Sequence, residues 1–283
     1  MPSSSLFPKK LNINIRGRLY SLDTPKVMGI LNITPDSFFD GGKYTTEKEQ
    51  LKRVEIMLNE GADFIDIGAQ SSRPGAKEIG AEKEISMLAI AIESIRKHFP
   101  QAIISIDTWH SNVAKTAYNL GADIINDISG GTFDKDMFKT ILELQIPYIL
   151  MHTGNKPEIM QNNPQYKNVL KEVIYFMSKQ ISELNLIGVN DIIIDPGFGF
   201  GKTLEHNYEL LKNLNHFSFL EAPLLVGISR KSMIYKYLNI KPEESLNSTT
   251  ALNMIALKNG ADILRVHDVK EARECIELFK LLK

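Results

Sequence analysis

The chain has 283 residues, of which 43% are hydrophobic and 24% are charged, and this length and apolar content suit one large α/β domain spanning residues 1–283. Its 33 Lys and Arg residues are matched by 34 Asp and Glu residues, which excludes the broad positive field used to bind nucleic acid or anionic membranes. The one cysteine, Cys275, excludes an internal disulfide and a multi-thiolate metal site, and we expect a buried, inert thiol.

The N-terminal segment bears on localisation and on the start of the fold. Met1 to Lys10 lack the apolar central stretch of a secretory signal, and no uncharged apolar run approaches the roughly 18 residues that suggest a membrane span. We therefore expect a cytoplasmic protein with no membrane or nucleic-acid partner. Next, Leu11 to Ile15 and Leu19 to Leu22 flank Arg16-Gly17-Arg18, which predicts a short β-hairpin over the N-terminal face of the fold.

Eight short apolar runs, mostly separated by helical patterns of roughly 10–20 residues, predict buried parallel strands. They are Val27 to Leu31, Phe64 to Ile67, Ile103 to Ile106, Ile124 to Ile125, Tyr148 to Met151, Ile192 to Ile194, Leu224 to Ile228 and Ile263 to Val266. Eight βα units predict a TIM (βα)8 barrel with the hairpin at its N-terminus. A doubly wound open sheet is the alternative, but the strand number and the even spread of polar strand ends favour closure.

A Gly-Ala-Asp fragment recurs immediately before three of these strands, at residues 61–63, 121–123 and 260–262. In each fragment the glycine ends a helical pattern and the apolar run of the strand follows. Aspartates in this position favour turns. We expect surface or turn roles for all three.

Barrel enzymes place their reacting groups at the C-terminal ends of strands, and the polar residues there fall into two sets. One set offers two carboxylates, an amide and an ammonium, which suit the edge of a planar heterocycle such as a pterin. Its members are Asp107, Asn126, Asp195 and Lys231. The other set offers an amide oxygen, two guanidinium groups and an imidazole, which suit a Mg-bound diphosphate. Its members are Asn32, Arg73, Arg265 and His267. One strand-end aspartate can merely cap a helix, but several around one rim favour a site.

Two further patterns are weaker signals. The run Gly197 to Thr203 ends like a Walker motif, but Pro196 stands where that motif needs glycine and Lys202 where the dinucleotide motif does. We expect a glycine-rich loop whose backbone approaches a flat ligand. The remaining histidines lack ligand-like spacing, so structural or surface roles and no zinc cluster are expected. They are His98, His110, His152, His206 and His216.

From about Lys26 onward, ordered segments of the chain resemble the dihydropteroate synthases. The matching motifs are Gly29-Ile-Leu-Asn-Ile-Thr-Pro-Asp-Ser-Phe38 with Asp40-Gly41-Gly42, Ser71-Ser72-Arg73-Pro74-Gly75-Ala76, Ser105-Ile-Asp107-Thr108, Ile125-Asn126-Asp127, Asp195-Pro-Gly-Phe-Gly-Phe-Gly-Lys202, Gly227-Ile-Ser-Arg-Lys-Ser232 and Arg265-Val-His-Asp268. The resemblance implies a Mg²⁺-dependent transfer in which 4-aminobenzoate displaces diphosphate from (7,8-dihydropterin-6-yl)methyl diphosphate. It also implies a homodimer.

The resemblance assigns roles to individual positions. The implied pterin ligands are Asp107, Asn126, Asp195 and Lys231. The implied diphosphate ligands are Asn32, Ser72, Arg73, Arg265, Val266 and His267, with Asn32 also holding the metal. The residues implied to border aminobenzoate are Ser72, Pro74, Phe200 and Ser229. The implied catalytic residues are Arg73, Asp107, Lys231, Arg265 and His267.

The chain departs from the family pattern at Gln70, at Ser72, at Trp109-His110 and in the loop from Met151 to Pro157. None of these departures replaces an expected pterin or diphosphate ligand. Two other functions remain as alternatives, a pterin-binding corrinoid-linked methyltransferase and a catalytically silent pterin-binding paralogue. The first has no diphosphate to expel, so the diphosphate set argues against it, and the presence of every expected ligand argues against the second.

Overall fold

The computed structural model describes residues 9–34, 46–71, 76, 78–154, 156–157, 160 and 164–282. Within this part, the main sheet consists of β3 (Lys26–Asn32), β4 (Phe64–Gly68), β5 (Ile103–Asp107), β6 (Ile124–Asp127), β7 (Tyr148–Met151), β8 (Ile192–Asp195), β9 (Leu225–Val226) and β10 (Ile263–Val266). Its parallel strands pair in the order β8-β7-β6-β5-β4-β3-β10-β9. A bridge between Ile194 and Leu224 brings the two outer strands together. The predicted TIM barrel, nearly closed, is confirmed.

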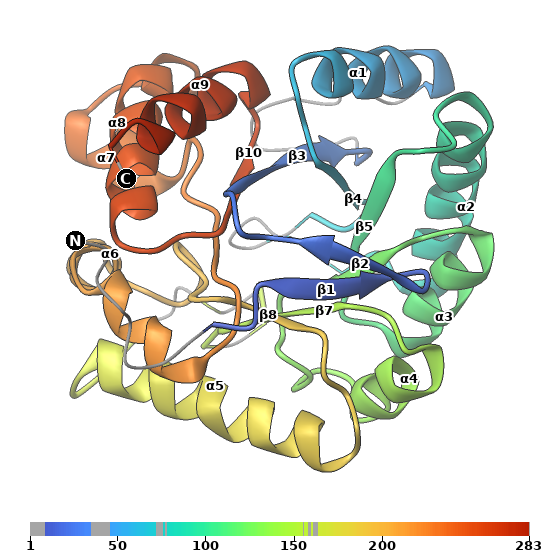
Figure 1. Ribbon diagram of the computed structural model, residues 1–283, viewed down its shortest axis with the longest axis horizontal. Coiled ribbons are helices and arrows are strands. Elements are labelled where there is room, and N and C mark those ends of the chain that lie inside the picture. The colour runs from blue at the N-terminus through green and yellow to red at the C-terminus, as the bar shows by residue number, and fades with distance from the viewer. Residues whose placement is uncertain are drawn as a thin grey trace.

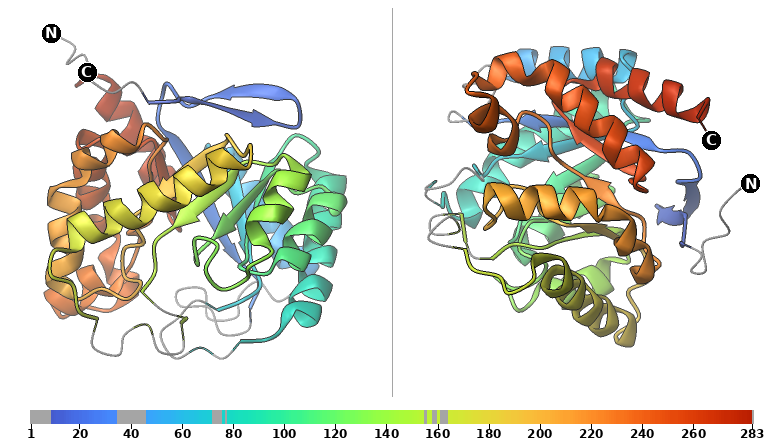
Figure 2. Two further views of the ribbon diagram at one scale, coloured as in Figure 1. Left: turned by 90° about the horizontal axis from the view of Figure 1, so that it is seen from below. Right: turned by 90° about the vertical axis from the view of Figure 1, so that its left-hand side faces the viewer.

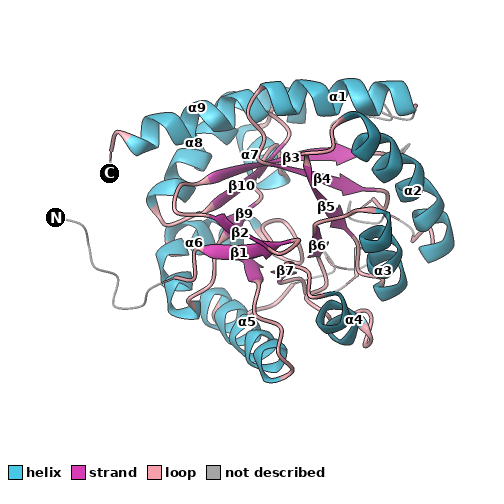
Figure 3. Cartoon of the chain, turned by 45° about the vertical axis from the view of Figure 1, so that its right-hand side comes forward, coloured by secondary structure: helices cyan, strands magenta, loops and turns pink. Residues whose placement is uncertain are grey.

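Helices surround the strands on the outside (Figure 1, Figure 3). They are α1 (Glu47–Asn59), α2 (Ala81–His98), α3 (Ser111–Leu120), α4 (Met137–Leu144), α5 (Val169–Leu186), α6 (Leu204–Lys212), α7 (Ser232–Leu238), α8 (Leu246–Lys258) and α9 (Val269–Lys280), with the 3-10 helices η1 (Leu214–Leu220) and η2 (Pro242–Ser245). Among the described helices, none combines the length and apolar character needed to cross a bilayer. Cys275 on α9 is buried, as expected.

Local sequence signals set several helix ends. Thr46 and Glu49 form a capping box at the start of α1, which satisfies backbone N–H groups that have no partner within the helix. Gly121 ends α3 in the left-handed region, with φ 117°, a conformation that glycine adopts without steric cost. The chain can therefore turn directly from α3 into the next strand.

Alternation along the strands places every second side chain inside the barrel. The inner residues nearest the hairpin are apolar and form one buried cluster, which includes Met28, Phe64, Ile124, Ile149, Ile193, Leu225 and Ile263. Two residues further along, the same alternation directs a mostly polar set inward, namely Ile30, Asp66, Ser105, Asn126, Met151, Asp195 and Arg265. The barrel interior therefore changes from apolar to polar toward the carboxyl ends of its strands.

The predicted hairpin is present and closes the apolar end of the barrel. It consists of the antiparallel strands β1 (Asn12–Ile15) and β2 (Arg18–Ser21), and it lies across one end of the strands (Figure 2). Ile13, Ile15 and Leu22 pack against the inner apolar residues of the barrel. Because side chains of the described residues fill that end, the interior polar residues face the other end of the barrel.

The aspartates of the three Gly-Ala-Asp fragments join neighbouring strands at the hairpin end. Their carboxylates accept backbone N–H bonds of 2.8 Å in the pairs Asp63–Val27, Asp123–Ile104 and Asp262–Leu224. Each carboxylate also forms an ion pair with a basic side chain: Arg273 with Asp63, Arg96 with Asp123, and Lys9 with Asp262. These contacts give the aspartates structural roles in the turns that precede the strands; Asp123 is buried, so a surface position is wrong for it but a turn role is not.

Candidate active site

Polar strand-end residues lie side by side at the end of the barrel opposite the hairpin. In the strand register Asn32 pairs with Gly68, Gly68 with Asp107, and Asp107 with Asn126, so they form one row across β3 to β6. A Cβ atom on Gly68 would lie 3.6 Å from both Asn32 Oδ1 and Asp107 Cβ. Both distances are ordinary van der Waals contacts, so the side chains of Asn32 and Asp107 flank Gly68 closely on either side.

Asp66, one layer deeper, contacts Asn126 of this row directly and Asp107 through Arg265, and the sequence motifs assigned it no role. Its side chain is fully buried. Oδ1 accepts a hydrogen bond of 2.6 Å from Ser105 Oγ, and Oδ2 accepts bonds of 3.0 Å from Asn126 Nδ2 and 2.7 Å from Arg265 Nε. Burying a carboxylate without such donors would be costly. The sequence did contain a signal for this role, because Asp66 is an acidic residue within an apolar strand and the alternation of side chains along that strand directs it into the barrel.

Arg265 connects the two sets of residues that the sequence analysis placed apart. Its Nε donates to Asp66 and its Nη2 donates to Asp107 Oδ2 at 2.8 Å. A residue assigned to diphosphate is thus ion-paired with one assigned to the pterin. A change at Arg265 should therefore affect both halves of the site.

The loop after β8 brings Asp195 and Lys231 into one structure. Asp195 Oδ1 accepts a hydrogen bond of 2.8 Å from the backbone N–H of Gly197. Lys231 Nζ donates to the carbonyl oxygen of Phe198 and lies 4.7 Å from the centre of the Phe200 ring. Gly197 has φ +70°, and a Cβ atom there would lie 1.9 Å from a neighbouring carbonyl oxygen, so only glycine fits. The expected glycine-rich loop thus contacts the residues assigned to the pterin.

His267 is held at the end of β10 by Ser229. The Ser229 hydroxyl accepts a bond of 3.2 Å from the His267 backbone N–H and lies 3.1 Å from its Nδ1. The hydroxyl oxygen accepts from the backbone, and its own proton is available to Nδ1; in the tautomer that accepts this proton, the ring proton lies on Nε2. Burial, together with the nearby Arg265 and Arg230 charges, lowers the pKa of His267 to about 3. The neutral ring can therefore donate from Nε2 to an anion.

Burial also shifts the ionisation of the residues assigned to the pterin. It raises the pKa of Asp107 to about 7, although the adjacent Arg265 guanidinium opposes the rise. It lowers the pKa of Lys231 to about 8, with Asp195 acting in the opposite direction. The pKa of Asp195 is raised by burial and held down in part by Lys231. An ionised Asp107 and a protonated Lys231 therefore coexist best between these two values.

Pterin affinity should consequently be highest between about pH 7 and pH 8. Below this range Asp107 is protonated and loses an acceptor, and above it Lys231 is neutral and loses its charge. Calorimetric titration with a diphosphate-free pterin from pH 6 to pH 9 would measure both limbs without interference from the ionisation of diphosphate. A Lys231→Met variant should lose the alkaline limb, and a flat profile for the unsubstituted protein would contradict this account.

The amide oxygen of Asn32 fits a hard cation held mainly by a ligand. Hydrogen bonds within the described chain leave this amide uncommitted. No group of three His, Cys, Asp or Glu side chains among the described residues could hold a metal ion. A single protein oxygen can still suffice for Mg²⁺, because this ion commonly keeps several waters and binds substrate phosphate oxygens. The donor set is therefore compatible with Mg²⁺ bound together with a diphosphate.

The other expected site residues differ in what the structure says of them. Ser72, Arg73 and Pro74 lie outside the described residues. The side chain of Val266 is buried in the barrel wall, so only its backbone can contact a ligand.

Gln70 stabilises the connection after β4, because its Oε1 accepts a hydrogen bond of 2.8 Å from the backbone N–H of Ile79 and its Nε2 donates to the carbonyl oxygen of Ser71.

His110, at a position where the chain departs from the family pattern, connects three loops around the mouth of the barrel. Its ring nitrogens lie 2.8 Å from a Glu84 carboxylate oxygen and 2.9 Å from one of Glu78. Lys156 Nζ donates to Glu78 at 3.2 Å. The hydrogen bond to Glu84 is the main reason that the pKa of His110 is raised. The expected structural role is thus present, as a contact among the segments that follow β4, β5 and β7.

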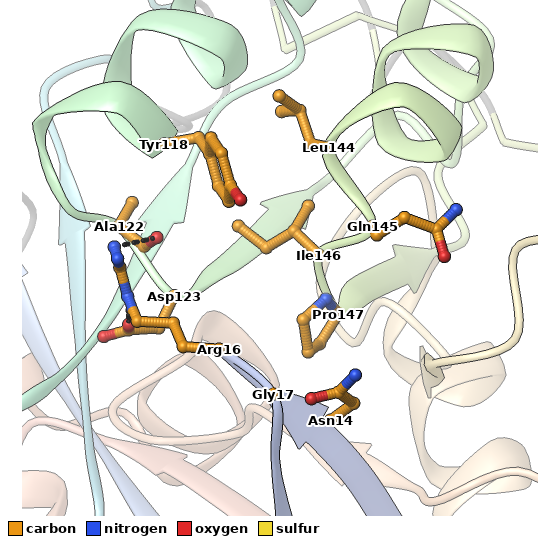
Figure 4. Close-up of a pocket in the computed structure, with 10 residues that line it drawn as sticks. All are labelled: Asn14, Arg16, Gly17, Tyr118, Ala122, Asp123, Leu144, Gln145, Ile146 and Pro147. Atoms are coloured by element: carbon orange, nitrogen blue, oxygen red, sulfur yellow. Dashed lines mark hydrogen bonds and ion pairs between the residues drawn. The ribbon is translucent and has the colours of Figure 1, made fainter.

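A pocket of about 370 Å³ lies at the hairpin end of the barrel (Figure 4). Arg16 of the hairpin, Tyr118 of α3 and Ile146 and Pro147 before β7 line it. Arg16 is ion-paired with Asp123, and the lining residues come from the hairpin, from α3 and from the segments that precede β6 and β7. This pocket is therefore separate from the polar residues at the carboxyl ends of the strands.

Comparison with known proteins agrees with the motifs. The family model of pterin binding enzymes matches residues 28–267. A dihydropteroate synthase of Escherichia coli strain K12 is 42% identical over 265 residues, or 93% of each chain. The structure of Yersinia pestis dihydropteroate synthase with a sulfonamide drug complex has a TM-score of 0.92 at 37% identity, covering 96% of this chain and 98% of that chain. The Xanthomonas albilineans enzyme with 4-aminobenzoic acid has a TM-score of 0.88 at 33% identity with the same coverage.

Proposed function

This chain belongs to the dihydropteroate synthase family of pterin-binding enzymes, and we propose that it transfers the pterinylmethyl group of (7,8-dihydropterin-6-yl)methyl diphosphate to 4-aminobenzoate, giving 7,8-dihydropteroate and diphosphate for folate synthesis. One observation carries the assignment to this site, namely the buried network in which Arg265 joins Asp66 and Asp107 at the open end of the barrel. This network places cationic and anionic groups together where a ligand with a polar heterocycle and an anionic arm would bind.

The pterin half of the proposal uses acceptors and donors of fixed type. A carboxylate such as Asp195 can accept two parallel N–H bonds from an aminopyrimidine edge, while Asn126 and Lys231 offer further polar groups for the remaining ring atoms. Asn126 is held in one orientation because its Nδ2 donates to Asp66. Rigid placement lowers the entropy cost of binding. A planar, polar ring therefore suits this half.

The diphosphate half stabilises charge that grows during the reaction. The bond between the pterin methylene carbon and the diphosphate oxygen breaks, and the electron pair leaves with diphosphate. Arg265 and the neutral His267 can donate hydrogen bonds to that oxygen charge, and such preorganised donors lower the barrier. The nitrogen of 4-aminobenzoate then bonds to the methylene carbon and loses its proton. No strong base is needed, because the aniline loses this proton after attack.

Formation of dihydropteroate tests the proposal directly. The purified protein, given both substrates, should form dihydropteroate detectable by chromatography, and omitting either substrate should abolish the product. A silent paralogue would bind pterin without forming the product. Product formation by an Asp195→Asn variant at the unsubstituted rate would remove the assigned site from the reaction.

We further propose Mg²⁺ as the cofactor, held by Asn32 together with the diphosphate. When bound there, the ion would neutralise part of the diphosphate charge. Activity should disappear with a chelator and return with Mg²⁺, and Asn32→Ala should raise the Mg²⁺ concentration needed for half-maximal binding of inorganic diphosphate. Titrating diphosphate binding against Mg²⁺ by calorimetry measures this without turnover. Full activity in rigorously metal-free protein would contradict it.

Homodimer formation and a cytoplasmic location belong to the same proposal. Exposed apolar side chains occur on neighbouring elements, with Tyr237 and Leu238 on α7, Ile255 on α8 and Leu278 on α9. Helices α8 and α9 pack against each other, and all three lie on one side of the barrel (Figure 1). Apolar residues gathered in this way favour a protein interface. This face is the one we propose for the homodimer.

A further inference from the structure

Lys202, at the end of the glycine-rich loop, is a buried cation to which the proposed reaction gives no role. Its side chain is 3% exposed. Its Nζ lies 2.9 Å from the carbonyl oxygen of Gly197, 3.0 Å from that of Phe200, 3.3 Å from that of His152 and 3.0 Å from His152 Nδ1. Carbonyl oxygens only accept hydrogen bonds, so this arrangement fits an ammonium group, whose three N–H donors are shared among the four acceptors.

The burial of this ammonium has a cost that the loop must offset. Removing a charge from water is unfavourable unless hydrogen bonds compensate for it. Burial lowers the pKa of Lys202 to about 7, with Asp195 opposing the shift, so the ammonium form predominates below about pH 7. The partners of Lys202 among the described residues are carbonyl oxygens and an imidazole nitrogen rather than carboxylates. The surrounding carbonyl oxygens and imidazole therefore provide the compensation. An amide side chain such as Gln has only two N–H donors and could not satisfy the same acceptors.

The acceptors of Lys202 lie in two segments, and both border the proposed active site. Gly197 and Phe200 belong to the loop after β8, while His152 follows β7. The ring of Phe200 packs in a buried apolar cluster with Trp109, Met151 and Met160. On its other side, the same ring lies against the Lys231 ammonium. Lys202 thus holds the backbone that determines where the Phe200 ring sits.

We propose that Lys202 is a positioning residue for the 4-aminobenzoate half of the site, acting by fixing the loop after β8 to the end of β7 and so placing the Phe200 ring. The identity of the ligand rests on the proposed function, whereas the placement of the loop does not. Asp195 and Lys231 also contact this loop, through the backbone of Gly197 and Phe198. They are carried by β8 and by the start of α7, however, so the pterin half should depend less on Lys202 than the Phe200 ring does.

Trp109 provides a readout of this placement that is independent of activity. It is the one tryptophan of the chain, it is buried, and it shares the apolar cluster with Phe200. A Lys202→Met variant keeps an unbranched side chain one atom shorter than lysine and leaves the carbonyl oxygens without their donor. The acrylamide quenching constant of Trp109 fluorescence should then increase about two- to fivefold, because buried carbonyl oxygens without a hydrogen-bond donor favour local opening of the loop. Lys212→Met, which removes the same charge from an exposed position on α6, is the matched control and should show no change.

Kinetics provide the second readout. Lys202→Met should raise the KM for 4-aminobenzoate about tenfold or more, while the Kd for a diphosphate-free pterin changes less than about threefold. A purely structural role would instead alter both in proportion to lost stability. Unchanged quenching and an unchanged KM in a cooperatively melting Lys202→Met protein would overturn the proposal, as would an equal loss of pterin affinity.

A second variant covers the possibility that Lys202→Met does not fold. His152→Phe keeps an aromatic ring and the backbone carbonyl acceptor but removes both ring nitrogens, including the Nδ1 acceptor of Lys202, so quenching and the KM for 4-aminobenzoate should shift in the same direction by a smaller factor. No shift in this variant would overturn the proposal. If the unsubstituted protein formed no dihydropteroate, the proposed function would fail, but the quenching comparison would still decide the role of Lys202.

Discussion

Replacing Arg265 by alanine should lower kcat by about 100- to 1000-fold, because a preorganised donor to the departing diphosphate is lost. The same change should also weaken the binding of a diphosphate-free pterin. It leaves Asp66 and Asp107 buried without the guanidinium that contacts both of them. Removing one partner of a buried ion pair commonly costs about 3–5 kcal/mol. Stopped-flow or steady-state kinetics and pterin calorimetry on one preparation would measure the two effects.

His267→Ala is the matched comparison for Arg265→Ala. Its ring contacts the Ser229 hydroxyl rather than a carboxylate of the pterin half, so turnover should fall while pterin affinity stays nearly intact. If Arg265→Ala also kept full pterin affinity, the Asp66–Arg265–Asp107 network would not hold the pterin half in place. A circular dichroism melt of each variant separates these effects from unfolding.

Asp195→Asn should lower pterin affinity at least tenfold, since a mispaired buried polar group costs on the order of 1–3 kcal/mol. An Asn side chain retains one oxygen, which can still accept from the Gly197 N–H and hold the loop. It replaces the second acceptor by a donor and removes the charge. The loss should therefore concern the ligand rather than the loop, and calorimetry with a diphosphate-free pterin measures it.

Asp191→Asn is the matched control, because it makes the same chemical change at the residue that directly precedes the first residue of β8. Asp191 pairs with the exposed Lys10 at the surface, where an ion pair contributes little to stability. This variant should bind pterin like the unsubstituted protein. Equal affinities for the Asp195 and Asp191 variants would exclude Asp195 from the pterin site.

The order of apolar runs predicted the barrel because parallel strands buried on both sides require such runs. The strands β7 and β10 have the predicted bounds, and β6 continues through Asp127 beyond the predicted Ile125. The predicted Leu224 to Ile228 strand is wrong in length, since pairing stops at Val226. Beyond it, Gly227 leads into a turn in which Arg230 has φ 53°, so the backbone leaves the strand conformation there.

The strand-end residues could be predicted because barrel strands place their carboxyl ends on one rim. Their hydrogen-bond partners could not be predicted in the same way. Arg265 lies 199 residues from Asp66 and 158 residues from Asp107 along the chain, and no local pattern specifies which carboxylate a guanidinium contacts. The same holds for His110 and its two glutamates. Such pairings depend on the strand register and on side-chain reach, which only the folded structure fixes.

Release of diphosphate from (7,8-dihydropterin-6-yl)methyl diphosphate, measured with and without 4-aminobenzoate, tests the central claim most directly. The network of Arg265 with Asp66 and Asp107 at the open end of the barrel predicts rapid release when both substrates and Mg²⁺ are present. One dihydropteroate should form for each diphosphate released, and the rate of diphosphate release should fall by about 100- to 1000-fold in Arg265→Ala. Release that never yields dihydropteroate, or release at an unchanged rate in Arg265→Ala, would contradict the account.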